Sequence, residues 1–260
     1  MEEMQVVIMK RQHMIFFISQ STITLTAMTH EDEGNFPYFW NSPSFQFKHP
    51  FGARVVGPTQ AGKSHFVIKL IQHAQLYISP SPTKIYWAYG EKNENQMKMI
   101  QSHSPIPIHF IEGMPDLEDI SSDEINLLIL DDLMTTVSNS KSASDLFTRA
   151  SHHRNMSVIF IVQNLYHQGK STKDISLNEK YTVLFKNPHD KGQVQYFGRK
   201  IFPEHPRFLI DAYEQATSRP HGYLIIIFDQ MTPDNQRVRT GIFPPEIPLI
   251  FIPKKQASKT

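Results

Sequence analysis

Residues 57–64 of this 260-residue chain decide its fold, and they read Gly57-Pro58-Thr59-Gln60-Ala61-Gly62-Lys63-Ser64. They match the pattern G-x-x-x-x-G-K-[ST] at every fixed position, with an apolar stretch before them and a helical pattern of apolar residues after them. Glycines let such a loop wrap closely around an anion, the helix N-terminus faces phosphates, and the lysine adds a mobile positive charge. The stretch therefore predicts a strand, a phosphate-binding loop and a helix, in that order.

The same loop predicts a site for ATP and Mg²⁺. We expect the nucleotide to contact the loop and the first residues of the helix, namely Gly57, Pro58, Thr59, Gln60, Ala61, Gly62, Lys63, Ser64 and His65. The Ser64 hydroxyl is expected to hold Mg²⁺, and Lys63 is expected to act in catalysis on the phosphates. A glycine turn before a helix also occurs without a ligand, but the flanking strand and helix patterns favour nucleotide binding.

Two adjacent carboxylates end the next motif, Leu127-Leu128-Ile129-Leu130-Asp131-Asp132, about seventy residues after the loop. The apolar run predicts a buried strand that delivers both carboxylates to its carboxyl end. Asp131 is expected in the magnesium shell, and Asp132 is expected to polarise the attacking water. Hydrophobic strands often end in Asp where a turn begins, so the motif indicates catalysis only in combination with the phosphate loop.

Three further catalytic candidates flank the apolar run at residues 158–162. Gln163 directly follows the run, and its amide would meet the γ-phosphate or the water if this strand lies beside the other two. Arg149 and Arg154 precede the run, where a guanidinium could reach the nucleotide of a neighbouring subunit. Both arginines also fit a solvated helix surface.

Short apolar runs alternate with longer mixed segments from Phe45 onward, a pattern typical of an α/β fold. It predicts strands at residues 53–56, 84–88, 108–111, 127–130, 158–162, 182–185 and 223–228, and helices at residues 63–76, 93–101, 142–152, 191–200 and 206–217. We expect a three-layer αβα arrangement, with a mainly parallel central sheet flanked by helices. Ligands of such sheets bind at the carboxyl ends of the strands.

The chain divides into three expected parts: a leader at residues 1–44, an ATPase domain at residues 45–243 and a proline-rich tail at residues 244–260. Cysteine is absent, which excludes disulfides and cysteine-ligated zinc. The most apolar stretch near the N-terminus, residues 14–28, is interrupted by polar residues and is too short to span a bilayer. These features indicate a soluble intracellular protein with no membrane partner.

The formal net charge of +1 gives no overall attraction for a polyanion, so nucleic-acid binding depends on local basic surfaces. One basic segment also contains aromatic residues, and it comprises Lys170, Lys173, Lys180, Lys186 and Lys191 with Tyr166, Tyr181 and Phe185. This mixture fits contact with a DNA backbone, and it fits a soluble charged surface equally well.

Residues 45–230 resemble the FtsK/HerA-type genome-packaging ATPases of large DNA viruses, particularly those of Maverick/Polinton and adintovirus-like elements, with the poxvirus packaging ATPase more distant. The resemblance rests on the phosphate loop, on Leu130-Asp131-Asp132-Leu133-Met134, on Ser151-His152-His153-Arg154-Asn155 leading to Val162-Gln163-Asn164-Leu165, and on residues 181–191. It implies a RecA-like P-loop NTPase core, a homo-oligomeric ring with ATP between subunits, and translocation of double-stranded DNA into a capsid. Capsid or portal-like proteins are the implied partners, in the host cytoplasm, the nucleus or the virion. Asp132 departs from the family's usual Asp-Glu pair.

Two other functions stay open at this stage. A different P-loop enzyme is the first, although a GTPase would need an Asn-Lys-x-Asp base reader, which is absent, and a kinase would need an arginine-rich lid, which we cannot locate. A non-hydrolysing assembly protein that kept the fold is the second. The intact Lys63, Ser64 and Asp131 argue against loss of activity.

Overall fold

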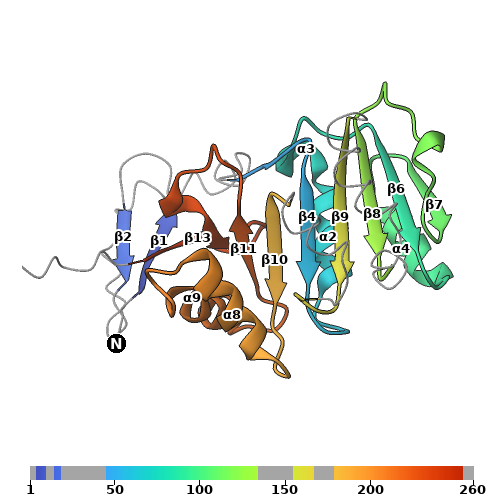
Figure 1. The fold of residues 1–260 in the computed structure, drawn as a ribbon. Coiled ribbons are helices and arrows are strands. Elements are labelled where there is room, and N and C mark those ends of the chain that lie inside the picture. Colours follow the sequence, from blue (N-terminus) through green and yellow to red (C-terminus); the bar gives the residue numbers. More distant parts are fainter. Residues whose placement is uncertain (1–3, 10–14, 19–44, 134–154, 167–178, 254–260) are drawn as a thin grey trace, which may run out of the picture. The chain divides into compact units, whose positions relative to one another are not determined.

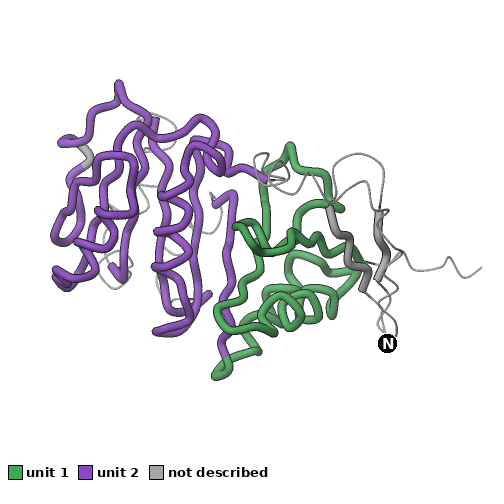
Figure 2. The backbone as a smooth tube through the Cα atoms, turned by 180° about the vertical axis from the view of Figure 1, so that it is seen from behind, with its two compact units in different colours: residues 1–44, 188–260 green, residues 45–187 purple. Residues whose placement is uncertain are grey.

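The computed structural model describes residues 4–9, 15–18, 45–133, 155–166 and 179–253, with the side chains of residues 4–9, 15–18 and 117 excepted. The chain forms two compact units (Figure 2). One contains residues 45–187, and the other contains residues 1–44 together with residues 188–260.

The 45–187 unit is built on a parallel sheet with the strand order β10-β4-β9-β8-β6-β7 (Figure 1). Every residue of β4, β9 and β10 is buried, as expected for strands covered on both faces. The strands are β4 (Gly52–Val56), β6 (Lys84–Tyr89), β7 (Ile108–Glu112), β8 (Asn126–Asp131), β9 (Met156–Val162) and β10 (Tyr181–Phe185).

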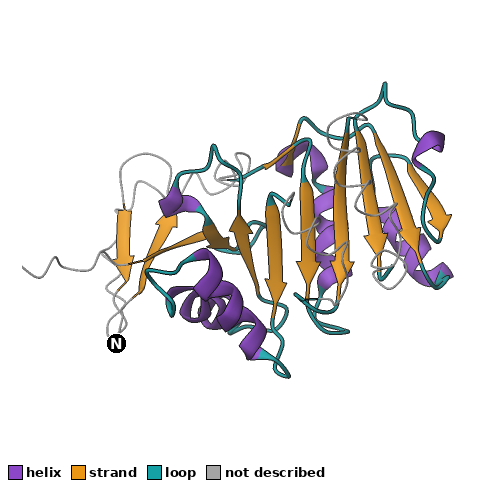
Figure 3. Cartoon of the chain, viewed as in Figure 1, coloured by secondary structure: helices purple, strands orange, loops and turns teal. Residues whose placement is uncertain are grey.

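Two helices of this unit pack against each other, which places them on the same side of its sheet (Figure 3). They are α2 (Lys63–Gln72), which buries five apolar side chains, and α4 (Glu94–His103), whose N-terminus is capped by the Asn93 side chain. The smaller elements of the unit are α3 (Ala74–Tyr77), the strands β3 (Phe47–Lys48) and β5 (Ile78–Ser79), and the 3₁₀ turn η2 (Leu117–Asp119). The helix predicted at residues 142–152 lies outside the described residues.

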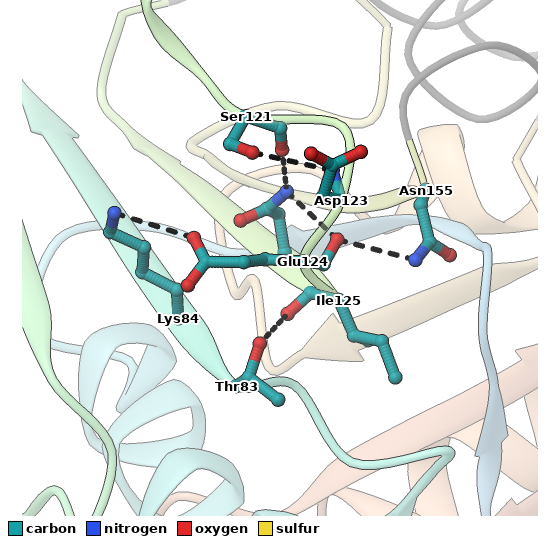
Figure 4. A network of polar contacts seen from close by, with 8 residues as sticks. Thr83, Lys84, Ser121, Asp123, Glu124, Ile125 and Asn155 are labelled. Carbon is teal, nitrogen blue, oxygen red and sulfur yellow. Dashed lines mark hydrogen bonds and ion pairs between the residues drawn. The ribbon is translucent and has the colours of Figure 1, made fainter.

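A polar network joins the amino ends of three strands of this sheet, at the edge opposite Asp131 (Figure 4). The Thr83 hydroxyl donates to the Ile125 carbonyl over 3.3 Å, and the Asn155 amide donates to the Glu124 carbonyl over 3.2 Å. The fully buried Asn126 amide donates to the Ser121 carbonyl over 2.7 Å. These bonds hold together the loops at the start of β6, β8 and β9.

The second unit contains an antiparallel sheet with the strand order β2-β1-β13-β12-β11. Helices α8 (Lys191–Ile201) and α9 (Phe208–Ala216) pack against each other, and α9 contacts β11. The strands are β1 (Met4–Met9), β2 (Ile15–Ile18), β11 (Tyr223–Ile227), β12 (Val238–Thr240) and β13 (Leu249–Pro253), and a 3₁₀ turn η3 (Asp234–Gln236) precedes β12.

The predicted α/β fold, with a mainly parallel sheet flanked by helices, is confirmed. The expected division into residues 1–44, 45–243 and 244–260 stays a prediction; the boundary between the two compact units follows Asn187, and the terminal segments contain strands. The expected tail contains β13, whose apolar run between Pro248 and Pro253 pairs with both β1 and β12. Proline is tolerated at the ends of a strand, so these prolines bound β13 and do not mark a linker. No helix in the described part of the chain has the length and apolar character needed to cross a bilayer.

Candidate active site

The phosphate loop connects the carboxyl end of β4 to the start of α2. The Gly57 N–H donates to the Val162 carbonyl over 3.2 Å, and the Ala61 N–H donates to the Pro58 carbonyl over 3.2 Å. Gly62 precedes α2 with φ 109, a left-handed conformation that glycine adopts without steric cost. The loop is therefore a tight turn that is fixed at one end to β9 and at the other to the helix.

Gly57 is required by the close approach of the neighbouring strand. A Cβ atom at this position would lie 2.7 Å from the Cβ of Phe185, at the end of β10, and 3.3 Å from the Cβ of Ala61. Phe185 is itself buried against Phe66 of α2, with ring centroids 6.0 Å apart. The space beside the loop therefore admits only glycine without a shift of the backbone.

Lys63 lies within the loop that precedes it. Its ammonium donates to the carbonyls of Gly57 over 2.7 Å and of Pro58 over 2.9 Å. Burial lowers the pKa of Lys63, while the carboxylates of Asp132 and Asp131 oppose that shift. The ammonium therefore lies in the electrostatic field of both aspartates, and it has no carboxylate in direct contact among the described residues.

Asp131 ends β8 and is partly buried. Its carboxylate accepts a hydrogen bond from the Gln96 amide over 3.3 Å, and the indole N–H of Trp87 also acts on it. Burial raises the pKa of Asp131 and the adjacent Asp132 charge adds to that rise, while the Trp87 hydrogen bond, the Lys63 charge and the Gln96 hydrogen bond oppose it. A partly desolvated carboxylate of this kind gains more from a cation than an exposed one does.

Asp132 lies opposite Gln163, with the Gln163 amide donating to its two carboxylate oxygens over 3.1 Å and 3.4 Å. Asp132 has φ 54, a left-handed conformation in which Asp is one of the more tolerated residues, and its N–H donates to the Ile161 carbonyl over 3.3 Å. Strand β9 lies between β4 and β8. That strand order places Gln163 between the strand of the phosphate loop and the strand of the aspartates.

A cavity of about 760 Å³ opens at this edge of the sheet, and Ser64, Asp131 and Asp132 all line it. A hydroxyl and two carboxylates are oxygen donors, the ligand type that Mg²⁺ prefers, and Mg²⁺ usually takes one or two protein carboxylates together with substrate phosphates. The donor set therefore fits the expected ion. The rest of the lining comes from Trp87, from Ile100 and from residues 89–97, which connect β6 to α4 and form its first turn.

The structure brings together most of the residues that the sequence predicted. One edge of one sheet holds Lys63, Ser64, Asp131, Asp132 and Gln163. In the loop region, the exposed residues include Thr59, Gln60 and His65. Arg149 and Arg154 lie outside the described residues.

Sequence reasoning missed the contacts of Trp87 and Gln96 with Asp131. No motif marks these two residues. The position of Trp87 follows from the pairing of β6 with β8, in which Tyr89 is opposite Asp131, and the position of Gln96 follows from the packing of α4 against α2.

No protein-family model matches this chain, and no curated protein matches it. Solved structures do show similarity. One is B204, the DNA-packaging ATPase from Sulfolobus turreted icosahedral virus, with 12% identity and a TM-score of 0.48 over 74% of this chain and 97% of that chain. Another is the genome-packaging NTPase B204 from Sulfolobus turreted icosahedral virus 2 in complex with ATP-gammaS, with 11% identity and a TM-score of 0.46 over 73% of this chain and 96% of that chain.

A third similar structure is the cytoplasmic domain of the Thermomonospora curvata type VII secretion ATPase EccC, with 12% identity and a TM-score of 0.45. The match covers 80% of this chain and 26% of that chain. These structures include the class of protein whose motifs the sequence resembles. Because the identities are low, we infer function from this chain's own residues.

Proposed function

We propose that this chain is an ATPase of the P-loop class that uses hydrolysis to translocate double-stranded DNA, in the packaging of a viral or virus-like genome into a capsid. One observation supports the ATPase above all others. Three segments that are far apart in the sequence bring Lys63, Ser64, Asp131, Asp132 and Gln163 to the carboxyl edge of one parallel sheet. This edge is where ligands of such sheets bind.

The loop and the start of α2 would hold the phosphates of ATP. The backbone N–H groups at the helix N-terminus face an anion, and the Lys63 ammonium would exchange its two loop carbonyls for phosphate oxygens. Ser64 and Asp131 would hold Mg²⁺, which neutralises charge on the phosphates when it is bound. Exchange at Lys63 is favourable because a phosphate is charged and a carbonyl is not.

Hydrolysis requires a water molecule to attack the γ-phosphorus while the bond to the β,γ-bridging oxygen breaks, giving ADP and phosphate. Asp132 would accept the proton of that water, and the Gln163 amide, which contacts both Asp132 oxygens, would orient the carboxylate and the water. Asp132 is exposed, so solvent has access to this carboxylate. The pair therefore provides the base and the orienting amide that in-line attack needs.

The DNA-translocating part of the proposal rests on the motif resemblance over residues 45–230. It includes a homo-oligomeric ring, with Arg149 or Arg154 reaching the nucleotide of a neighbouring subunit, and capsid or portal-like proteins as partners. The net charge of +1 requires that any contact with DNA be made by local basic surfaces.

The decisive experiment measures ATP hydrolysis by the full chain with and without duplex DNA, alongside a sizing experiment. We expect turnover that duplex DNA stimulates, and loss of that turnover in Lys63→Ala, because the variant removes the charge that faces the phosphates. The matched control is Lys98→Ala, which removes an exposed lysine of α4 and should leave turnover unchanged.

Other outcomes would point to the other functions. Turnover that ignores DNA and requires a small phosphate acceptor would show a kinase. Nucleotide binding without any turnover would show a non-hydrolysing assembly protein. Hydrolysis that Lys63→Ala leaves intact would contradict the proposed site itself.

A further inference from the structure

We infer that Trp87 and Gln96 are positioning residues, which fix the Asp131 carboxylate in the orientation in which it can bind Mg²⁺ or the water bound to the ion. We also infer that the fluorescence of Trp87 changes when Mg²⁺ occupies the site. This inference rests on the proposed nucleotide site and deepens it. Gln96 donates a hydrogen bond to the carboxylate over 3.3 Å, the indole N–H of Trp87 favours the ionised form of the same carboxylate, and both residues line the 760 Å³ cavity beside Ser64.

Trp87 lies in β6, the strand that pairs with β8 on the side away from the phosphate loop. Only 2% of its surface is exposed, so its ring is held rigidly by the core. An indole is a donor and never an acceptor, so its N–H can only stabilise the ionised carboxylate and cannot take the place of a metal ligand. The contact therefore fixes the carboxylate from the protein interior.

Gln96 approaches the same carboxylate from the first turn of α4. Its backbone N–H donates to the Asn93 side chain over 3.1 Å, and its side-chain amide donates to Asp131 Oδ2 over 3.3 Å. The helix cap thus holds the residue whose side chain reaches the carboxylate. Two donors from two different elements restrict the rotation of the Asp131 carboxylate.

Two donors leave the carboxylate able to act as a ligand. An ionised carboxylate offers about four lone-pair sites, so two hydrogen bonds leave others for an ion or its bound water. Donors to a ligating carboxylate set its orientation, and their removal typically costs about 10–100-fold in metal affinity or activity. We therefore expect these two residues to determine how much Mg²⁺ the site requires.

The first test measures Mg²⁺-dependent binding of a fluorescent, non-hydrolysable ATP analogue by anisotropy. We expect Gln96→Leu to raise the Mg²⁺ concentration for half-maximal binding by about 10-fold, because the donor is lost. Gln96→Met, which keeps the length of the side chain and also lacks the donor, should raise it by a similar factor. The same change at an exposed site of α4, Gln101→Leu, is the control and should have no effect.

The two variants at position 96 separate positioning from packing. Methionine is close to glutamine in length and volume, so a residue that only fills space would tolerate Gln96→Met better than Gln96→Leu. If Gln96→Met keeps the Mg²⁺ dependence of the unaltered chain, the positioning role of Gln96 is wrong.

The second test uses the fluorescence of Trp87. The chain contains two tryptophans, so Trp40→Phe leaves Trp87 as the only one. We expect its emission to change when Mg²⁺ is added to the analogue-bound protein, since the ion alters the carboxylate that the indole contacts. The change should be absent when EDTA removes the ion, and absent in Trp40→Phe/Asp131→Ala. Mg²⁺-dependent binding by anisotropy without any change in Trp87 emission would overturn the sensing role.

Failure of the proposed function gives a different result from failure of this inference. If the unaltered chain binds no analogue at any Mg²⁺ concentration, both are overturned. If it binds the analogue with Mg²⁺ and the variants at positions 87 and 96 behave like the unaltered chain, only the inference is overturned. Trp87→Phe, which keeps an aromatic ring and removes the N–H, completes the series and should raise the Mg²⁺ requirement.

Discussion

Single residues at the sheet edge explain why the candidate site forms where it does. Asp131 and Asp132 are adjacent, but they have different surroundings, because Asp131 is partly buried beneath two donors and Asp132 is exposed opposite Gln163. Like charges on neighbours are costly unless each has its own stabilising partner. These different environments fit a metal ligand and a proton acceptor, respectively.

Replacing Gln163 tests the second of these environments. We expect Gln163→Ala to lower kcat for ATP by about 100-fold, the typical effect of losing one oriented donor in an active site, with KM changed little. The adjacent exposed Asn164 provides the control, and Asn164→Ala should leave both constants unchanged. Steady-state kinetics at saturating Mg²⁺ give the comparison. A rise in KM with unchanged kcat would assign Gln163 to substrate binding.

The close approach of β10 to the phosphate loop predicts a stability effect at Gly57. A methyl group there would meet the Cβ of Phe185 at 2.7 Å, and we expect Gly57→Ala to destabilise the 45–187 unit by about 1–3 kcal/mol, the usual cost of overpacking. At Gly90 the nearest atom to an added Cβ is 3.5 Å away, so Gly90→Ala should cost less than about 0.5 kcal/mol. Urea unfolding followed by Trp87 emission in the Trp40→Phe background measures both.

The elements of the fold were largely predictable because their signals are local. The apolar runs that precede Gly57, Asp131 and Gln163 each became a buried strand of the parallel sheet. The helix predicted at residues 63–76 ends earlier, at Gln72, because His73 leaves the helical conformation with ψ 30 and a short second helix follows. Local patterns give the type of an element more reliably than its ends.

The contacts around Asp131 were not predictable, because they depend on pairing between distant strands. Gln163 was inferred from its place at the end of an apolar run. Trp87 lies inside its strand and Gln96 lies in a helix, and neither has a sequence signal that points to Asp131. The register of β6 beside β8 brings Trp87 there, and the packing of α4 against α2 brings Gln96 there. The strands near both chain ends were missed for the same reason, since β1 and β13 are paired across almost the whole sequence.

His49 links the segment before β4 to the start of β9, and this link makes the stability of the 45–187 unit depend on pH. His49 Nδ1 lies 2.6 Å from the Ser157 hydroxyl, and Nε2 lies 2.9 Å from Asn155 Oδ1. Burial lowers the pKa of His49 below its ordinary 6.5, and the Lys180 charge adds to this, while the hydrogen bonds to Asn155 oppose it. The folded unit therefore binds this proton less readily than the unfolded chain does.

The sign of the effect follows from proton linkage. As pH falls through 6.5, the unfolded chain takes up the proton first, so we expect this unit to lose stability between pH 6.5 and the lowered pKa of folded His49. One group contributes at most about 1.4 kcal/mol per pH unit. His49→Gln cannot titrate and should show a smaller loss between pH 7.5 and pH 5, measured by urea unfolding. His103→Gln, at an exposed position of α4, is the control and should keep the loss of the unaltered chain.

The whole molecule is organised so that every described residue of the candidate site belongs to the 45–187 unit. The other unit joins the two ends of the chain, because β1 pairs with β13 and β13 pairs with β12. Two compact units need not unfold in one step, so each free energy of unfolding is assigned to one unit by a probe that lies within it. For the second unit, hydrogen exchange resolved along the sequence supplies such local probes.

Replacing Phe251 tests whether the C-terminal segment is part of a core or a free tail. Its side chain is 1% exposed, and it is paired with Val238 of β12 and with Val6 of β1. Truncation of a buried Phe leaves a cavity, so we expect Phe251→Ala to lower the opening free energy of amides in β11, β12 and β13 by about 3–5 kcal/mol, or to the limit set by the unit's stability. Ile247 is 54% exposed, and Ile247→Ala should change the exchange of the same amides by less than about 0.5 kcal/mol. Equal exchange in the two variants would mean that residues 249–253 do not complete the sheet. Strand β12 would then be an edge strand with unpaired backbone groups, which proteins usually avoid.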